Sequence, residues 1–222
     1  MHPGTPSRNV ARNDQLRRRI AVEAARLMSE HGIRDFHLAK RKAAAHLNVP
    51  AEASLPSNSE IEQALREHQR LFHTDQQPQH LRFLREAAQE AMRFFRRFEP
   101  RLVGAVLDGT ADQHSAICLH LFSDTPEQVV VFLVEHAIDY RELDRRQRLR
   151  HDEYAQFPAF LIEHRDARFD LTVLPHDAIR QSPLDRIHER PMRRANLAEV
   201  ERLLASEENQ EPWTPINPDE QR

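Results

Sequence analysis

The sequence predicts an α+β fold, in which helices flank a small mixed β-sheet and a helical region precedes it. Three observations predict this class. Apolar residues recur at the spacing of amphipathic helices up to about residue 98. From residue 101 onward they follow the two-residue period of strands. A further helical pattern interrupts these strand-like segments and another follows them, which is an order typical of α+β domains.

The composition indicates a soluble protein of the cytoplasm. Of the 222 residues, 39% are hydrophobic and 30% are charged, and the net charge of −3 excludes a uniformly basic coat. The single cysteine, Cys118, excludes an intramolecular disulfide and fits a reducing compartment. No apolar run is long enough to span a bilayer, and the first residues lack the apolar core of a secretory signal. We therefore expect a bacterial, cytoplasmic protein with no membrane partner.

The N-terminal region, residues 14–76, is predicted to be helical, after a disordered stretch over residues 1–13. Gly32 stands where a left-handed residue closes a helix. Either Asn58 or Ser59 can cap the last helix of this region. The three expected helices cover about 16–31, 36–47 and 60–72.

An α+β domain is expected over residues 77–178, opening with an amphipathic helix from about 80 to 98. A helix follows Thr125, the expected N-cap, and Pro126. The charged segment 140–154 fits either a strand or a loop. Residues 101–107 fit a short strand or a strand that leads into a turn. Strand patterns also cover about 115–122, 157–164 and 168–174, and the last two are joined as a hairpin.

The C-terminal part is predicted to be an arm and a helix over residues 179–206, followed by a disordered tail over 207–222. Asn196 precedes the helical pattern and has the side chain of an N-cap residue. The arm contains two prolines and several arginines, and its sequence assigns no chemistry to it.

Two of the four glycines, Gly104 and Gly109, frame a short turn between strand-like segments. The stretch from residue 80 to about 175 resembles the core of the polymerase-beta-like nucleotidyltransferase superfamily. In that core a helix precedes an apolar strand ending in Gly-Ser, a turn leads to a strand carrying Asp-x-Asp, and a later strand supplies a third carboxylate. Gly104-Ala105 stands at the Gly-Ser position, and Asp170 stands at the third carboxylate.

The resemblance implies a triphosphate site at the glycine turn. Glycine lets the backbone approach phosphates closely, and amides in the turn donate to phosphate oxygens. Two carboxylates two residues apart on a strand share one face, and with a third they hold the Mg²⁺ ions of the transfer reaction. The residues expected to contact the nucleotide are Gly104, Ala105, Gly109 and Thr110.

Two of the three expected metal carboxylates are missing. Ala116 and Cys118 occupy the Asp-x-Asp positions, and neither a methyl group nor a soft thiol suits Mg²⁺. Asp170 remains as the one catalytic remnant. The sequence therefore favours a pseudoenzyme of nucleotidyltransferase fold, without metal, that acts as a nucleotide- or nucleic-acid-binding or regulatory protein.

Two alternatives stay open within this domain. An active enzyme can use Asp170 with Asp108 or Asp112 and Mg²⁺, and transfer a nucleoside monophosphate to a hydroxyl of RNA, protein or a small molecule. His114 and His120 share the strand parity of residues 116 and 118 and can contribute to a metal site, although ordinary packed or rim histidines are the favoured interpretation.

Residues 1–50 contain ten Arg or Lys against four Asp or Glu, so this end is basic. Its helix, glycine turn and second helix loosely resemble a helix-turn-helix regulator, which makes DNA binding a third candidate function. A helical hairpin packed on the main domain with a solvated basic face is the favoured interpretation. The candidate nucleic-acid contacts are Arg17, Arg18, Arg19, Lys40, Arg41 and Lys42.

Overall fold

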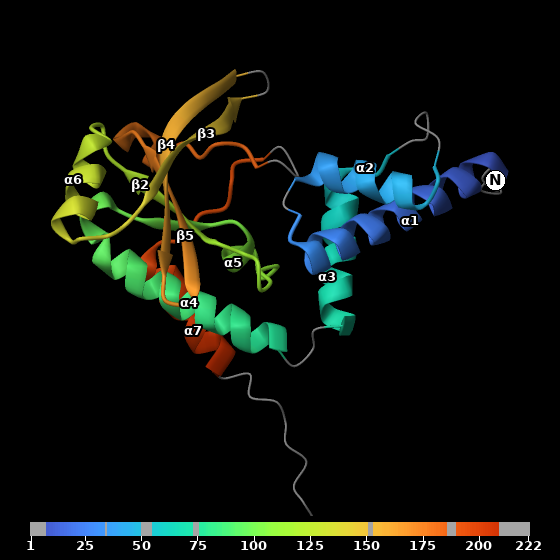
Figure 1. Ribbon diagram of the computed structural model, residues 1–222, viewed down its shortest axis with the longest axis horizontal. Coiled ribbons are helices and arrows are strands. Elements are labelled where there is room, and N and C mark those ends of the chain that lie inside the picture. Colours follow the sequence, from blue (N-terminus) through green and yellow to red (C-terminus); the bar gives the residue numbers. More distant parts are fainter. Residues whose placement is uncertain are drawn as a thin grey trace, which may run out of the picture.

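The computed structural model has the predicted α+β architecture, with a mixed five-stranded sheet and helices around it (Figure 1). None of the described helices combines the length and the apolar character needed to cross a bilayer. The structure describes residues 8–33, 35–49, 55–72, 76–150, 153–185 and 190–208.

The first three helices form a unit of their own beside the sheet (Figure 1). Both shorter helices pack against the first, and several alanines lie in their shared core, where small side chains let helices approach closely. The helices are α1 (Arg8–His31), α2 (Phe36–His46) and α3 (Asn58–Phe72). The buried core of the unit includes Ile20, Ala24, Met28, Ala39, Ala43, Ile61 and Leu65.

Gly32 closes α1 with a φ of +64°, as the sequence predicts. Two expectations for this unit differ from the structure. Residues 8–13, expected to be disordered, are the first turns of α1, because extending a helix that is already anchored by packing costs much less than nucleating a new one. The cap of α3 is Ser57, which accepts from the Glu60 amide at 3.2 Å while the Glu60 carboxylate accepts from the Ser57 amide at 2.7 Å. Residues 1–7 lie outside the described part.

The sheet has the strand order β1-β2-β5-β4-β3. Strands β2 and β5 are parallel neighbours, and the other pairs are antiparallel. The charged segment that fitted strand or loop is an edge strand, a place where charged side chains prevent further pairing. The strands are β1 (Arg101–Val103), β2 (Ile117–Phe122), β3 (Arg141–Arg150), β4 (Glu153–His164) and β5 (Ala167–Leu174).

The two faces of the sheet differ in chemistry. The back face is apolar and packs with α4 (Gln76–Phe94), α6 (Glu127–Glu135) and α7 (Leu197–Glu208) in one hydrophobic core. Burial of this surface, at about 25 cal/mol per Å², is the main stabilising contribution of the domain. The front face carries polar side chains at its centre, which include Cys118, His120, Asp170 and Thr172.

Of the two N-cap residues predicted in the main domain, Asn196 caps its helix with its side chain and Thr125 does not. Asn196 caps α7, because its side chain accepts from the Glu199 amide at 3.0 Å and the Glu199 carboxylate accepts from the Asn196 amide at 2.7 Å. Thr125 does not cap α6 through its side chain. Its carbonyl instead accepts from the Ser123 hydroxyl at 2.8 Å. Helix α7 extends to Glu208, and the rest of the predicted tail lies outside the described residues.

The arm between β5 and α7 connects the two edges of the sheet. After the short helix η2 (His176–Ile179), Leu184 bridges to Arg148 of β3, and Ala195 bridges to Leu102 of β1. The residues just before Ala195 therefore lie over the front face. This arrangement brings arginines of the arm to the polar centre of the sheet.

Candidate functional site

The three segments that carry the resemblance meet on the front face. Cys118 and Asp170 are direct partners in the parallel pairing of β2 and β5. A Cβ placed on Gly104 would lie 3.9 Å from the Cβ of Cys118, so the glycine turn lies directly against that residue. Gly104 has φ 73° and ψ −154°, a conformation that L side chains rarely adopt.

Asp170 is buried and bound to an arginine. Its Oδ2 accepts a hydrogen bond from Nη2 of Arg145, which comes from β3 on the far side of β4. Its Oδ1 is buried and has no hydrogen-bond partner among the described residues. A guanidinium therefore lies where the resemblance implies a metal ion. The donor set does not fit Mg²⁺, because Ala116 offers no ligand and Cys118 offers sulfur.

The predicted phosphate-binding turn is the short helix α5 (Ala105–Asp108), and its two ends have different surroundings. Gly104 lies at the front-face end, beside Cys118. Gly109 ends the helix with φ 77°, and a Cβ on it would lie 3.7 Å from Nη2 of Arg85. Thr110 is buried and its amide donates to the Ala105 carbonyl at 2.9 Å. The structure thus places Gly104 beside Cys118 of the front face and Gly109 beside α4, while Ala105 packs against the hydrophobic core and Thr110 is buried.

Arg85 of α4 holds the short helix α5 through hydrogen bonds to its carbonyl groups. It is buried, and its Nε donates to the Val106 carbonyl at 3.0 Å while its Nη2 donates to the Leu107 carbonyl at 3.3 Å. Its Nη1 forms an ion pair with Glu207 of α7. Arg85 therefore ties α4, α5 and α7 together, and it satisfies carbonyls that a four-residue helix leaves without partners.

His120 lies one step along the front face from Cys118 and is buried against the arm. Its Nδ1 accepts a hydrogen bond from Nε of Arg194 at 3.1 Å. Burial, and then the positive charge of Arg194, lower the pKa of His120 from 6.5 to about 3. The imidazole is therefore neutral at physiological pH, with its proton on Nε2.

Sequence reasoning missed both front-face arginines. Arg145 lies in the segment left open between strand and loop, and Arg194 lies in the arm to which no chemistry was assigned. A strand interpretation of residues 141–147 would have placed Arg141, Leu143 and Arg145 on one face by parity. No local pattern identifies which of these reaches Asp170, because that contact spans another strand.

The alternative carboxylates Asp108 and Asp112, and the neighbouring Asp124, make other contacts. Asp108 pairs with Arg193 at 3.7 Å, and burial raises its pKa. The Asp112 side chain accepts from the His114 amide at 2.9 Å. The Asp124 side chain accepts from the His176 amide at 2.9 Å. These three aspartates therefore stabilise turns and the arm.

His114 is not on β2 but in the turn before it, where its carbonyl accepts from Nη2 of Arg168 at 2.7 Å. It therefore does not share a strand face with His120. In the part of the chain that the structure describes, no group of three or more His, Cys, Asp or Glu side chains is arranged to hold a metal ion.

The basic residues of the N-terminal unit separate into two groups. Arg17 donates to Glu60 at 2.6 Å, and Lys40 is half-buried near the same carboxylate, with its pKa lowered by burial and raised in part by Glu60. Those two side chains stabilise the helix contacts. The exposed members of the predicted set are Arg18, Arg19, Arg41 and Lys42.

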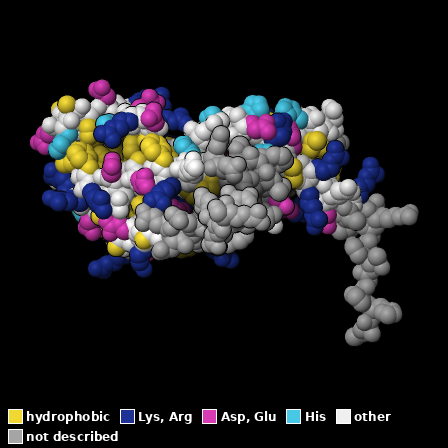
Figure 2. All heavy atoms as spheres, turned by 90° about the horizontal axis from the view of Figure 1, so that it is seen from below, with side chains coloured by type: hydrophobic (Ala, Val, Ile, Leu, Met, Phe, Trp, Pro, Cys, Tyr) yellow, Lys and Arg dark blue, Asp and Glu magenta, His cyan; other side chains and the backbone are white. Residues whose placement is uncertain are grey.

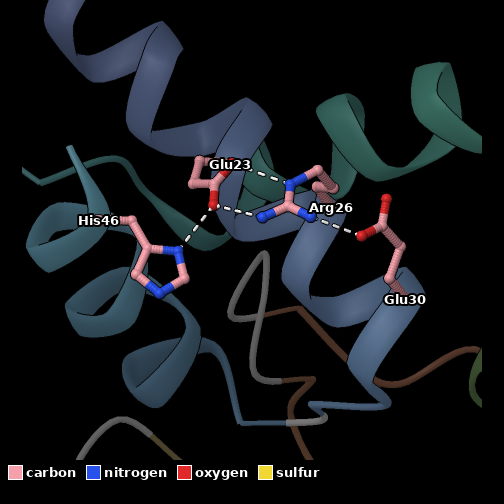
Figure 3. A network of polar contacts seen from close by, with 4 residues as sticks. All are labelled: Glu23, Arg26, Glu30 and His46. Carbon is pink, nitrogen blue, oxygen red and sulfur yellow. Dashed lines mark hydrogen bonds and ion pairs between the residues drawn. The ribbon is translucent and has the colours of Figure 1, made fainter.

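Acidic residues balance further charge on α1 (Figure 3). Arg26 donates to both oxygens of Glu23, at 3.0 and 2.8 Å, and to Glu30 at 2.5 Å. His46 of α2 lies 3.0 Å from the same Glu23 carboxylate. The Arg26 hydrogen bond, against a smaller opposing effect of burial, lowers the pKa of Glu23 to about 2. The network joins α1 to α2 and makes this side of the unit mixed in charge.

A large apolar cleft lies away from this site. It has a volume of about 600 Å³ and lies between α4, the end of α6 and the β4–β5 hairpin, on the back side of the sheet. Figure 2 shows hydrophobic side chains gathered on this side of the molecule among charged ones. Its lining includes Phe83, Phe94, Ile138, Ile162 and Phe169. The cleft is therefore separate from the front face on which Cys118 and Asp170 lie.

Comparison of the chain with models of protein families, with curated proteins and with solved structures finds no match. The geometry of the front face is thus the basis for a functional assignment.

Proposed function

We propose that this protein binds nucleotides through a nucleotidyltransferase-like core that has lost metal-dependent transfer, and that it acts as a regulatory protein. The observation that carries the proposal is the register of Cys118 beside Asp170, with Gly104 against Cys118. These residues come from three segments far apart in the chain. Their meeting at one point supports a common phosphate site, as the resemblance implies.

Binding without transfer follows from the chemistry of these side chains. An Mg²⁺ ion needs several oxygen ligands, and the one carboxylate here is engaged by Arg145. A guanidinium, in contrast, binds phosphate oxygens directly through its planar set of donors. We therefore expect nucleotide binding to be independent of divalent metal.

Titration calorimetry with ATP, CTP, GTP and UTP tests the proposal, with EDTA in one series and Mg²⁺ in the other. We expect at least one nucleotide to bind in EDTA with an affinity that Mg²⁺ changes less than about threefold. Arg145→Gln is expected to weaken binding about tenfold, because one charge-assisted contact is lost. Arg146→Gln is the matched control, because Arg146 is the next residue of β3 and faces the other side. Absence of binding to all four nucleotides at millimolar concentration overturns the proposal.

The same samples separate the proposal from its alternatives. Release of pyrophosphate that requires Mg²⁺ and is lost in Asp170→Asn would identify an active transferase instead. We expect none, because Asp112 and Asp124 accept backbone hydrogen bonds in their own turns and Asp108 lies beside Arg193 of the arm. Tight, salt-sensitive binding of duplex DNA that falls in Arg18→Gln and persists in Arg145→Gln would identify a DNA-binding regulator.

A further inference from the structure

A small basic pocket lies where the arm meets the start of α7, next to the β1 edge of the front face. Its volume is about 240 Å³. Three arginines and one glutamate line it, so the pocket is net positive. Its lining residues are Arg193, Arg194, Ala195, Glu199, Arg202 and Leu203.

Arg194 is the innermost of the three arginines and is half-buried. Its Nε donates to His120, its Nη1 donates to the Ala178 carbonyl at 2.6 Å, and its guanidinium lies 5.2 Å from the centre of the Phe122 ring. All these partners are neutral. Its Nη2 is buried without a hydrogen-bond partner among the described residues. Burial and the nearby charge of Arg101 lower the pKa of Arg194 to about 10.

A half-buried cation without an anionic partner destabilises a fold, because desolvation is not compensated by an opposite charge. An anion in the pocket removes this penalty. The positive charges around the pocket also attract an anion, and guanidinium groups at its surface donate to the anion's oxygens.

The other two arginines, Arg193 and Arg202, have solvent-exposed guanidinium groups that can bind a ligand. Arg193 is exposed, and its distance of 3.7 Å to Asp108 is longer than a hydrogen bond. Arg202 is exposed, and its Nε has only a 3.4 Å contact with the Ala198 carbonyl. Glu199 is held in the capping contact with the Asn196 amide, so its orientation is fixed by the helix start.

We propose that this pocket binds the phosphate groups of a small phosphorylated ligand, with Arg194 at its base and Arg193 and Arg202 at its rim. Three planar donor groups suit a diphosphate or triphosphate chain better than a single carboxylate ligand. The ligand class rests on the proposed function, in which a nucleotide supplies the phosphates. Arg194 connects the two sites, because it contacts His120 on the face that carries Cys118 and Asp170.

Pyrophosphate is the probe, used with the full chain in EDTA and at constant ionic strength set with chloride. Calorimetry and thermal unfolding report binding. Arg193→Gln and Arg202→Gln are each expected to weaken pyrophosphate binding about three- to tenfold, and both exposed positions tolerate the change. Arg93→Gln is the matched control, because Arg93 is an exposed arginine that pairs with Glu201 of α7 outside the pocket.

Arg194→Met supplies a second readout. We expect it to abolish the rise in melting temperature caused by pyrophosphate. Without pyrophosphate its melting temperature should fall, because His120 and the Ala178 carbonyl lose their donor, so the readout is the shift that pyrophosphate causes within each protein. The proposal is overturned if chloride alone raises the melting temperature as much as pyrophosphate does. It is also overturned if the wild type, Arg193→Gln and Arg202→Gln bind pyrophosphate with equal affinity.

ATP separates this inference from the proposed function. If ATP binds with an affinity that depends on Arg145 but not on Arg193 or Arg202, the phosphate-pocket proposal is wrong and the front-face nucleotide site is supported. If pyrophosphate binding depends on Arg193 and Arg202 while no nucleotide binds, the phosphate pocket stands and the nucleotide function fails.

Discussion

Arg145 of β3 binds the buried carboxylate of Asp170 on β5, although β4 lies between these two strands. The contact therefore ties the charged edge of the sheet to its centre. Asp170 in turn lies beside Cys118 in register. One ion pair thus holds the edge strand in place and neutralises the remaining carboxylate of the nucleotidyltransferase-like pattern.

Removing this arginine is expected to destabilise the fold. Arg145→Gln leaves the Asp170 carboxylate, whose side chain is 11% exposed, without its charged partner. We expect a loss of about 1–2 kcal/mol in the free energy of unfolding, since Arg145 itself is partly solvated. Urea denaturation at pH 7 measures it. Asp170→Asn in the Arg145→Gln background should recover part of the loss, because a neutral amide tolerates burial better than a carboxylate.

Arg146→Gln provides the control, since Arg146 contacts the Tyr154 ring at the surface and should contribute at most about 0.5–1 kcal/mol. Equal stability of Arg145→Gln and the wild type would contradict a structural role for the ion pair.

Much of the fold was predictable because it depends on local patterns. The left-handed Gly32, the N-cap Asn196 and the β4–β5 hairpin all follow from short-range steric and hydrogen-bonding preferences. The charged strand β3 was left open because its charged and polar side chains hide the apolar alternation that identifies most strands. Its neighbour β4 supplies the pairing that makes it a strand.

The candidate site was predictable only for residues that lie in the nucleotidyltransferase-like sequence pattern. The nearness of Gly104, Cys118 and Asp170 is consistent with that pattern. The contacts of Arg145 and Arg194 were not predictable, because each depends on how a distant segment crosses the sheet. Sequence spacing carries no information on such a crossing.

His120 gives the fold a dependence on pH. Its pKa is lowered from 6.5 to about 3 by burial and by Arg194, so the folded protein stays unprotonated there while the unfolded chain takes up a proton below pH 6.5. Stability should therefore decrease as the pH falls from 6.5 toward 3, with this residue contributing up to about 1.4 kcal/mol per pH unit.

Urea unfolding of His120→Gln at pH 7, 6 and 5 tests this dependence. Glutamine keeps an acceptor for Arg194 but does not titrate, so the decrease in stability between pH 7 and 5 should be smaller than in the wild type. His164→Gln changes an exposed histidine and should keep the slope of the wild type. Identical slopes in all three proteins would mean that His120 does not oppose protonation in the fold.

Gly32 is required by its conformation and by its neighbour. Its φ is +64°, and a Cβ at this position would lie 3.0 Å from Cγ of His114 in the turn before β2. Gly32→Ala should therefore lower stability by about 1–2 kcal/mol, from left-handed strain and a steric clash. His114→Ala removes the two closer ring contacts but neither the Cβ contact at 3.3 Å nor the strain, so Gly32→Ala should cost less in that background. A thermal double-mutant cycle measures the difference, and full additivity would argue against contact between the two residues.

Arg85 connects the scaffold to the site, because it is the residue that fixes α5 behind the front face. It donates to the carbonyls of Val106 and Leu107 and pairs with Glu207. Arg85→Met should cost about 2–4 kcal/mol, since it leaves buried carbonyls and a partly buried carboxylate without partners.

The exposed Arg82, which donates to Glu86 one turn away, supplies the control Arg82→Gln with an expected cost near 0.5 kcal/mol. Hydrogen exchange of the α5 amides distinguishes a local role from a global one. If Arg85 fixes the glycine turn, exchange at residues 105–110 should accelerate more in Arg85→Met than exchange in β5. A uniform acceleration across the sheet would instead mean that Arg85 stabilises the whole domain and not the turn that faces Cys118.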